Sequence, residues 1–515
     1  LGDVYKRQPY IYGDNFFSAW NADLNLTLGR EGGNRASTYN WETNASNAGI
    51  DWYNENDNFF TDSAVPGAAI LDRVNAIRTT NAASLITVPM LGYVAADEAG
   101  GNEAGDVGLT PDYFNVRLKE SLPRKPGGVL SLTPDTTDHE VYQDEFVNWT
   151  EHTFFPTGHG PGDLPIFYSL DNEPGLWSST HPRLHPTAAT YAEMTEKTIA
   201  YASMIKDLAP QGLVFGPALY GWNDYVNLQN AVDAGPHGDF IDYYLDTMKA
   251  QETAQGRRIL DVLDLHWYTE VYAGGAYVGD PYDTSASAVA SRVQVPRSLW
   301  DPTYVENSWI AGYLEYQPIA LIPRMLGKIA AHYPGTKLSI SEYYLGGGNT
   351  ISGGVTQADA LGIFGREGVF AATMWRQGHS NDDYYIDAAF RMYRNFDGAG
   401  STFGDTNISA VTSDKVTTSA YASTDTAHPG RLVVVAINKS LDQLLTAIDF
   451  AGGSNYQSTG VYRITSVGPT PMHRPNLAAV SPDNFRYAMP PMSVTTLVFE
   501  ASASEGEGEG EGEGE

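Results

Sequence analysis

The chain has 515 residues, 42% hydrophobic and 18% charged, which is enough for one large domain and a second, smaller one. Its formal net charge of −31 argues against nucleic-acid and anionic-membrane partners, because both require basic surfaces. That charge suits a neutral polymer substrate and an extracellular location, and we expect a secreted bacterial protein. The absence of cysteine excludes disulfides, thiol nucleophiles and Cys-zinc sites. No apolar run reaches 18 residues, so no transmembrane helix is predicted.

The first eight residues, LGDVYKRQ, are typical of a processed, truncated or artefactual end, so they are excluded from the fold prediction. From residue 10 onward, short apolar runs predict buried strands, because continuous rather than alternating hydrophobicity is expected when both faces of a parallel strand are covered. Eight such strands are predicted, at residues 10–12, 24–28, 85–89, 166–170, 213–217, 262–266, 338–341 and 370–374.

Helical patterns lie between these strands. The apolar stripe of residues 191–208 has alternating spacings of three and four, and it lies between Pro186 and Pro210. Helices are also predicted at 240–249, 319–332 and 384–395. Eight alternating strand and helix units predict an α/β fold, a TIM-like (β/α)8 barrel, over residues 9–395.

The pattern changes after residue 396. Short Val- and Thr-rich strands, notably at 431–438 and 493–499, are separated by turn clusters and predict an antiparallel β-sandwich over 396–500. We interpret it as a structural buttress for the barrel. The alternative, a carbohydrate-binding role, is less favoured because this segment has no Trp to stack on a sugar ring. The Glu–Gly alternation at 505–515 predicts a disordered linker over 501–515, either to a further module or as a solubilising tail.

Two of the barrel strands lead to a glutamate. The run YSLDNEP at 168–174 brings Glu173 to the end of the fourth strand, and KLSISE at 337–342 ends the seventh strand at Glu342. Active sites of such barrels lie at the carboxyl ends of the strands, and the fourth and seventh strands face each other across the mouth. Two facing carboxylates are what hydrolysis of a glycosidic bond requires.

Other polar residues at strand ends are candidate substrate-binding groups. Asn172 is placed to bind the sugar 2-hydroxyl, His266 and Tyr268 point to one side after the sixth strand, and Arg30 and Asn34 follow the second strand. Each prediction has an alternative. The Asn-Glu-Pro motif is also found at ordinary turns, and His266 could be a core histidine. Arg30 could form a buried salt bridge with Glu31.

Sugar rings stack on exposed aromatic faces, so the chain should also supply aromatic platforms near these carboxylates. The candidates are Trp41, Trp177, Tyr220, Trp267 and Trp375. For Trp375 the rival reading is a side chain that caps the core.

No cofactor is expected for catalysis. The acidic loop at residues 97–106, DEAGGNEAGD, is rich in oxygen ligands and is a candidate for a structural calcium ion, with a plain solvated loop as the alternative.

Many segments of the chain resemble glycoside hydrolase family 44, from about residue 9 to residue 499. The matching motifs include PYIYG at 9–13, GGNR at 32–35, LDNEP at 170–174, DLHWY at 264–268, LWDPTY at 299–304 and STFGD at 401–405. Two features depart from the family pattern: the first eight residues do not resemble the strand that usually joins the sandwich, and Glu31 stands where an apolar or aromatic residue is usual.

The resemblance implies a TIM-like barrel with a β-sandwich and endo-acting cleavage of β-1,4-glucans, including xyloglucan. It implies Glu173 as the acid/base and Glu342 as the nucleophile of a retaining mechanism, with carboxyl carbons about 5–5.5 Å apart. A mannanase or xylanase of the same mechanism and a non-catalytic polysaccharide-binding protein are the alternatives.

Overall fold

The computed structural model describes residues 5–6, 9–15, 17, 19–98, 109–378, 382–451 and 455–502. The Glu–Gly tail and residues 99–106 of the acidic loop, with its predicted calcium site, therefore lie outside the described residues. Within the described ranges, no helix is both long and apolar enough to cross a membrane.

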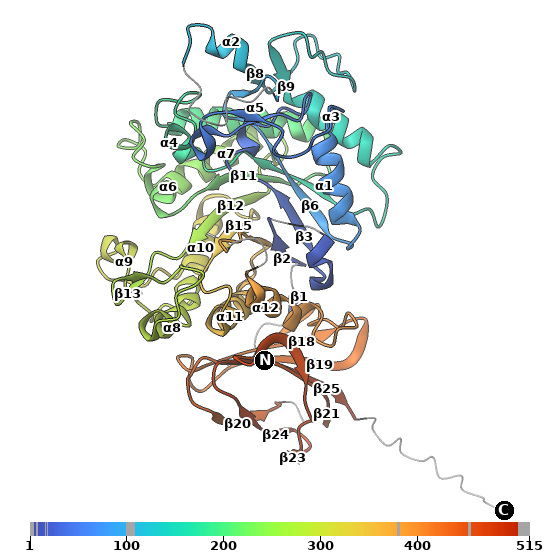
Figure 1. The fold of residues 1–515 in the computed structure, drawn as a ribbon, viewed down its shortest axis with the longest axis vertical. Helices are drawn as coiled ribbons and strands as arrows, with labels where there is room; N and C mark the ends of the chain where they lie inside the picture. Colours follow the sequence, from blue (N-terminus) through green and yellow to red (C-terminus); the bar gives the residue numbers. More distant parts are fainter. Residues whose placement is uncertain are drawn as a thin grey trace, which may run out of the picture.

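Eight parallel strands close into a barrel, which confirms the predicted fold class (Figure 1). They are β2 (Tyr10–Asp14), β3 (Leu28–Glu31), β6 (Ala83–Val88), β10 (Ile166–Leu170), β11 (Val214–Leu219), β12 (Val262–Tyr268), β15 (Lys337–Tyr344) and β16 (Ala371–Met374). The apolar runs predicted seven of them within a few residues. The second prediction, at 24–28, was wrong except for Leu28. Residues 19–24 form a 3-10 helix (η1, Ala19–Leu24), and Asn25 has a positive φ of 48°, which no strand accommodates.

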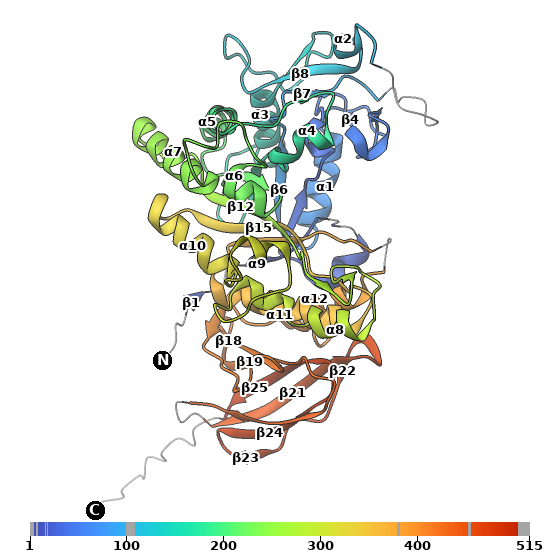
Figure 2. The ribbon, with the colours of Figure 1, turned by 90° about the vertical axis from the view of Figure 1, so that its left-hand side faces the viewer.

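Helices surround the barrel on its outside (Figures 1 and 2). The larger ones are α1 (Ala68–Arg78), α3 (Gln143–Phe154), α5 (Tyr191–Leu208), α7 (Phe240–Gln255), α10 (Leu321–His332), α11 (Ile351–Glu367) and α12 (Tyr384–Arg394). All four predicted helices are present. The sequence pattern did not predict α11, because nearly the whole helix is buried and a helix covered on all sides carries no polar stripe.

The connections above the strand ends contain short elements. These are β4 (Ser46–Asn47), β5 (Asn56–Asp57), β7 (Tyr93–Ala95), β8 (Leu118–Leu122), β9 (Glu140–Tyr142), β13 (Tyr272–Ala273), β14 (Ala276–Tyr277), α2 (Tyr113–Arg117), α4 (Trp177–Thr180), α6 (Trp222–Asn227), α8 (Ala286–Arg292), α9 (Trp309–Tyr313) and the 3-10 helices η2 (Ala36–Thr38), η3 (Gly49–Trp52), η4 (Pro174–Leu176) and η5 (Val295–Leu299). The longest connections follow β3, β6 and β12, so they are the ones that shape the surroundings of the site.

The C-terminal strands form two antiparallel sheets, drawn in orange and red below the barrel in Figures 1 and 2. They are β17 (Thr406–Ile408), β18 (Thr418–Asp425), β19 (His428–Asn438), β20 (Leu444–Asp449), β21 (Tyr456–Thr465), β22 (Gly468–His473), β23 (Ala479–Ser481), β24 (Asn484–Met489) and β25 (Ser493–Ala501). Phe485 of the small sheet and Phe499 of the large sheet share one core, while Val433 and Val435 on the other face of the large sheet belong to the barrel's core cluster. The sheet is thus covered on both sides.

The N-terminal residues contribute to this sheet. Tyr5–Lys6 form β1, which pairs with Asn407 and Thr406 of β17. Setting these residues aside at the sequence level was therefore wrong. Two residues of backbone pairing need no particular side chains, so no sequence motif marks this strand.

A buried ion pair joins the barrel to the sandwich. Lys439 Nζ lies 3.0 Å from Asp359 Oδ2, both side chains are 2% exposed, and Asp359 also accepts a hydrogen bond from Tyr421. We expect Lys439→Ala to destabilise the protein by about 3–5 kcal/mol, because it leaves a buried carboxylate without its cation. Urea unfolding of this variant and of Lys439→Met/Asp359→Leu measures the effect. The double variant removes both charges, so a loss as large as that of the single variant would contradict the explanation.

Candidate active site

A tight turn after β10 presents Glu173. Glu173 has a φ of 45°, its amide donates to Ala218 O at 2.9 Å, and Pro174 begins the 3-10 helix η4. The buried Asp171 anchors the turn, because it accepts hydrogen bonds from the Leu91 amide at 2.8 Å and from Trp177 Nε1 at 3.2 Å. The turn therefore aims the Glu173 side chain while its backbone is fixed from two sides.

Glu342 lies inside β15 rather than at its end, since the strand continues to Tyr344. The predicted strand, which stopped at Ser341, was too short. The two tyrosines that follow Glu342 are apolar enough to stay paired and buried. Glu342 is in register with His266 of the adjacent β12, just after an irregularity between Leu265 and His266. This irregularity brings His266 beside Glu342 at the barrel mouth.

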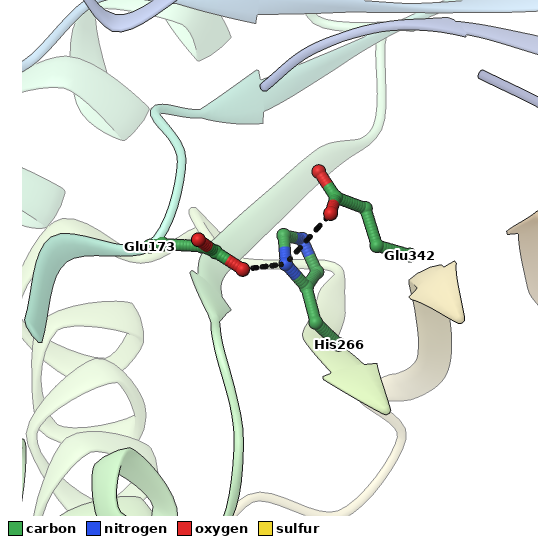
Figure 3. Close-up of side chains that lie close together, drawn as sticks. All are labelled: Glu173, His266 and Glu342. Atoms are coloured by element: carbon green, nitrogen blue, oxygen red, sulfur yellow. Dashed lines mark hydrogen bonds and ion pairs between the residues drawn. The ribbon is translucent and has the colours of Figure 1, made fainter. Parts of the chain in front are cut away.

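The two carboxylates converge on one imidazole, as Figure 3 shows. His266 Nδ1 lies 2.8 Å from Glu173 Oε1 and 3.5 Å from Glu342 Oε2. One nitrogen of His266 and one carboxylate oxygen of each glutamate all lie within 4.8 Å of one another. Two glutamates that are 169 positions apart in the chain therefore face one small volume.

Arg30 and Tyr268 hold Glu342. The fully buried guanidinium of Arg30 places Nη1 2.7 Å from Glu342 Oε1, and the Tyr268 hydroxyl donates to Glu342 Oε2 at 2.7 Å. Arg30 also donates to the side-chain oxygen of Asn172 at 2.9 Å. The rival pairing of Arg30 with Glu31 is wrong, because Glu31 pairs with Arg73 instead. A fixed cation and a phenol donor are partners that suit an ionised carboxylate.

The environment of Glu173 differs. Burial raises the pKa of Glu173 to about 7, Arg30 opposes this rise, and the negative charge of Asp51 adds to it. Burial also lowers the pKa of His266 to about 4, so the imidazole between the carboxyls is neutral at neutral pH. Glu173 thus keeps a proton, whereas Glu342 is paired with a cation. This difference is typical of an acid and a nucleophile.

The same three side chains could in principle ligate a metal, since a histidine and two carboxylates suit divalent ions. The Arg30 guanidinium, however, occupies one oxygen of Glu342 at 2.7 Å. A second cation on the same carboxylate would be repelled, so the residues fit acid–base chemistry better than metal binding.

Three of the predicted platforms are wrong. Trp41, Trp177 and Trp267 are 1–2% exposed and present no ring face to a substrate. Trp41 packs against Phe146 and Trp149 in the core. The Trp177 indole serves the turn instead, because it donates to Asp171 and to the backbone oxygen of Asn172.

The other predicted residues remain near the mouth. Tyr220 is half-buried and donates to Gln229, and Asn34 accepts from Asn172 Nδ2 at 3.4 Å. Trp375 is half-buried directly after β16, and its ring covers Gly33, where a β-carbon would lie 2.7 Å from the indole. Trp375 therefore keeps its place as a proposed platform.

Sequence reasoning missed three residues of the site. Asn15, after β2, accepts from Arg30 and donates to the backbone of Ser341, so it ties the arginine to β15. Asp51 accepts from Asn34 Nδ2 at 3.1 Å, and the neighbouring Trp52 is 48% exposed. Asn15 had a sequence signal, since it is a polar residue three positions after the predicted strand at 10–12. Asp51 and Trp52 lie in a long connection that has no such marker.

Comparison with known proteins connects this geometry to a family. The family model described as glycoside hydrolase family 44 matches residues 45–271. Endoglucanase A of Paenibacillus lautus is 38% identical over 509 residues, which cover 96% of this chain and 71% of that protein. The chain belongs to glycoside hydrolase family 44.

Two further relatives extend the comparison. A Paenibacillus polymyxa xyloglucanase of family 44, solved with xyloglucan, superposes with a TM-score of 0.90 at 36% identity, over 97% of this chain and 98% of that one. The β-mannanase/endoglucanase A of Caldicellulosiruptor saccharolyticus is 39% identical over 511 residues, which are 94% of this chain but only 37% of that protein. The family 44 fold thus spans nearly the whole chain, and the chain is a glycoside hydrolase.

Proposed function

We propose that this protein is a retaining, endo-acting hydrolase of β-1,4-glucan backbones, including xyloglucan. One observation carries the proposal: a carboxylate oxygen of Glu173 and one of Glu342 lie within 4.8 Å of each other, beside one His266 nitrogen, but the two carboxyls have opposite electrostatic environments. A short separation leaves no room for water between sugar and nucleophile, as an inverting enzyme would need, and so favours retention. The names of the endoglucanase and xyloglucanase relatives support the substrate class.

In the first step, a carboxylate oxygen of Glu342 attacks the anomeric carbon. The bond from that carbon to the glycosidic oxygen breaks, and protonated Glu173 gives its proton to the departing oxygen. In the second step, Glu173 takes a proton from water, the water oxygen bonds to the anomeric carbon, and Glu342 leaves as a carboxylate. Arg30 and Tyr268 stabilise Glu342 whenever it is charged.

Reducing-sugar release from barley β-glucan, xyloglucan, mannan and xylan under one set of conditions tests this substrate class. We expect the two glucans to be cleaved fastest, with a rapid fall in viscosity that marks endo action. Mannan as the preferred substrate would instead favour the second candidate, a β-mannanase, which the name of the Caldicellulosiruptor relative supports. A polysaccharide-binding role without catalysis requires that none of the four is hydrolysed.

We expect Trp52 to be a sugar platform in place of the buried indoles. It is 48% exposed, its ring centroid lies 5.0 Å from that of Tyr53 in an edge-to-face pair, and it adjoins Asp51, which is hydrogen-bonded to Asn34 of the site. Trp52→Ala should raise KM for a long glucan about tenfold with kcat nearly unchanged, because stacking contributes about 1–2 kcal/mol to binding. Trp52→Phe keeps an aromatic face and should retain most of the affinity. Equal KM values for wild type and Trp52→Ala would contradict the assignment.

Two further proposals concern the location of the protein and its tail: the acidic charge supports the first, and the Glu–Gly repeat supports the second. The protein is secreted by a bacterium, and the tail at 505–515 tethers the hydrolase to a further module. Detection of the protein in culture supernatant tests the first, and a stop codon directly after Glu515 in the coding sequence would contradict the second.

A further inference from the structure

A chain of side-chain hydrogen bonds runs from the catalytic carboxylate to the molecular surface. Arg30 contacts Glu342 at 2.7 Å and donates to Asn172 Oδ1 at 2.9 Å. Asn172 Nδ2 donates to Asn34 Oδ1 at 3.4 Å, and Asn34 Nδ2 donates to Asp51 Oδ2 at 3.1 Å. The side-chain amides of Asn172 and Asn34 each donate one hydrogen bond and accept another along this series. The final acceptor, Asp51, therefore sets the orientation of both amides.

The backbone that carries Asp51 is held in place. In η3 (Gly49–Trp52), the Asp51 amide donates to Ala48 O at 3.1 Å, and the Gly49 amide donates to the buried Asn47 side chain at 3.0 Å. Gly49 has a φ of 53°, and a β-carbon there would lie 2.2 Å from Thr180 O. The helix η3 is thus packed closely on α4, the helix that follows the Glu173 turn, so Asp51 sits in a fixed position relative to Glu173.

We propose that Asp51 is a positioning residue for both catalytic carboxyls: through Asn34 it orients the Asn172 amide that holds Arg30, and it presents an exposed negative charge to Glu173. This inference rests on the proposed function. The negative charge of Asp51 opposes deprotonation of Glu173 and so adds to the effect of burial. Because Asp51 is exposed, its contribution should depend on salt, unlike that of burial.

The remaining titratable groups around Glu173 are buried or half-buried parts of the barrel. His266 is neutral because its pKa is lowered to about 4, and the pKa of Asp224, on α6, is raised well above its usual value by burial. Other neighbours are Arg30, Glu342, Tyr220, Tyr225 and Tyr268, of which the three tyrosines have raised pKa values. Asp51 is therefore the exposed charge among these groups, and its charge can be removed by a substitution at the surface.

The test is the pH dependence of kcat/KM for a soluble β-1,4-glucan in wild type, Asp51→Asn and Asp51→Ala. Asparagine keeps an oxygen acceptor for Asn34 but removes the charge. We expect Asp51→Asn to move the alkaline limb to lower pH by about half a unit at low salt, and by less at 1 M salt. Asp51→Ala also breaks the hydrogen-bond chain, so we expect the same shift and a kcat at acidic pH that is about tenfold lower.

Asp62→Asn is the matched control, because Asp62 is exposed in the same connection. It accepts a hydrogen bond from Asn58 at 2.6 Å and takes no part in the hydrogen bonds that lead to Glu342. It changes net charge by the same amount and should leave the limb in place. An unmoved limb in Asp51→Asn, or an equal shift in Asp62→Asn, would overturn the proposal. A wild-type protein that hydrolyses no glucan would instead overturn the proposed function, so the two failures are distinguishable.

Discussion

Replacing Glu342 with alanine should lower kcat on β-1,4-glucan about 10⁴-fold or more, because the covalent intermediate then has no oxygen to form on. Substrate binding should be nearly unchanged, since Trp52, Trp375 and Asn172 remain. The measurement is reducing-sugar release together with binding of the inactive variant to xyloglucan, in buffer free of small nucleophiles such as azide and formate.

The variant also leaves the buried Arg30 without its ion-pair partner, so folding must be checked separately. Glu342→Gln provides this check, because its amide oxygen still accepts from Arg30 while the nucleophilic carboxylate is gone. A folded Glu342→Gln protein that binds glucan but does not cleave it is the expected result. Appreciable turnover in either variant would refute the assignment of Glu342.

Replacing Glu173 should remove the alkaline limb of the pH profile. The group works as an acid, so activity requires its protonated form, which is present below its pKa of about 7 and lost above it. In the wild type, kcat/KM should therefore fall about tenfold for each pH unit above 7. In Glu173→Ala this limb should disappear, and below pH 7 the rate on glucan should be about 10²–10⁴-fold lower than in the wild type.

Substrates of different leaving-group quality distinguish acid catalysis from a folding defect. An aryl cellobioside with a nitrophenol leaving group does not need a proton, so its first step should stay fast in Glu173→Ala and the glycosyl-enzyme should accumulate. Added azide should release that intermediate as a β-glycosyl azide, which also demonstrates retention. Equal losses on glucan and on the activated substrate would contradict the acid/base role.

The barrel was predictable because its strands are buried on both faces and so read as continuous apolar runs. The failures have local physical reasons. Asn25 with its positive φ ends the run at 24–28 before a strand can form, and α11 lacks a polar stripe because it lies between barrel and sandwich. The strand β1 depends on backbone pairing alone, which leaves no pattern in the side chains.

The candidate site was predictable in part. Residues at strand ends, such as Glu173, Arg30 and His266, were found because parallel strands deliver their carboxyl ends to one face. The aromatic platforms were not, because the type of residue does not tell whether a ring lies outward, as in Trp52, or inward, as in Trp41. That outcome depends on which connection covers the ring.

The order of apolar runs along this chain determined by itself the closed barrel, the separate antiparallel sheets and the two glutamates that end up at one mouth. These features follow from hydrophobic periodicity and from the direction of parallel strands, both of which are local properties of the sequence. Only the tertiary structure decided that Arg30 pairs with Glu342 rather than Glu31, and that Asp51 reaches the site through Asn34. Such pairings join residues that are far apart in the chain, and they depend on distances of a few ångströms that no local pattern encodes.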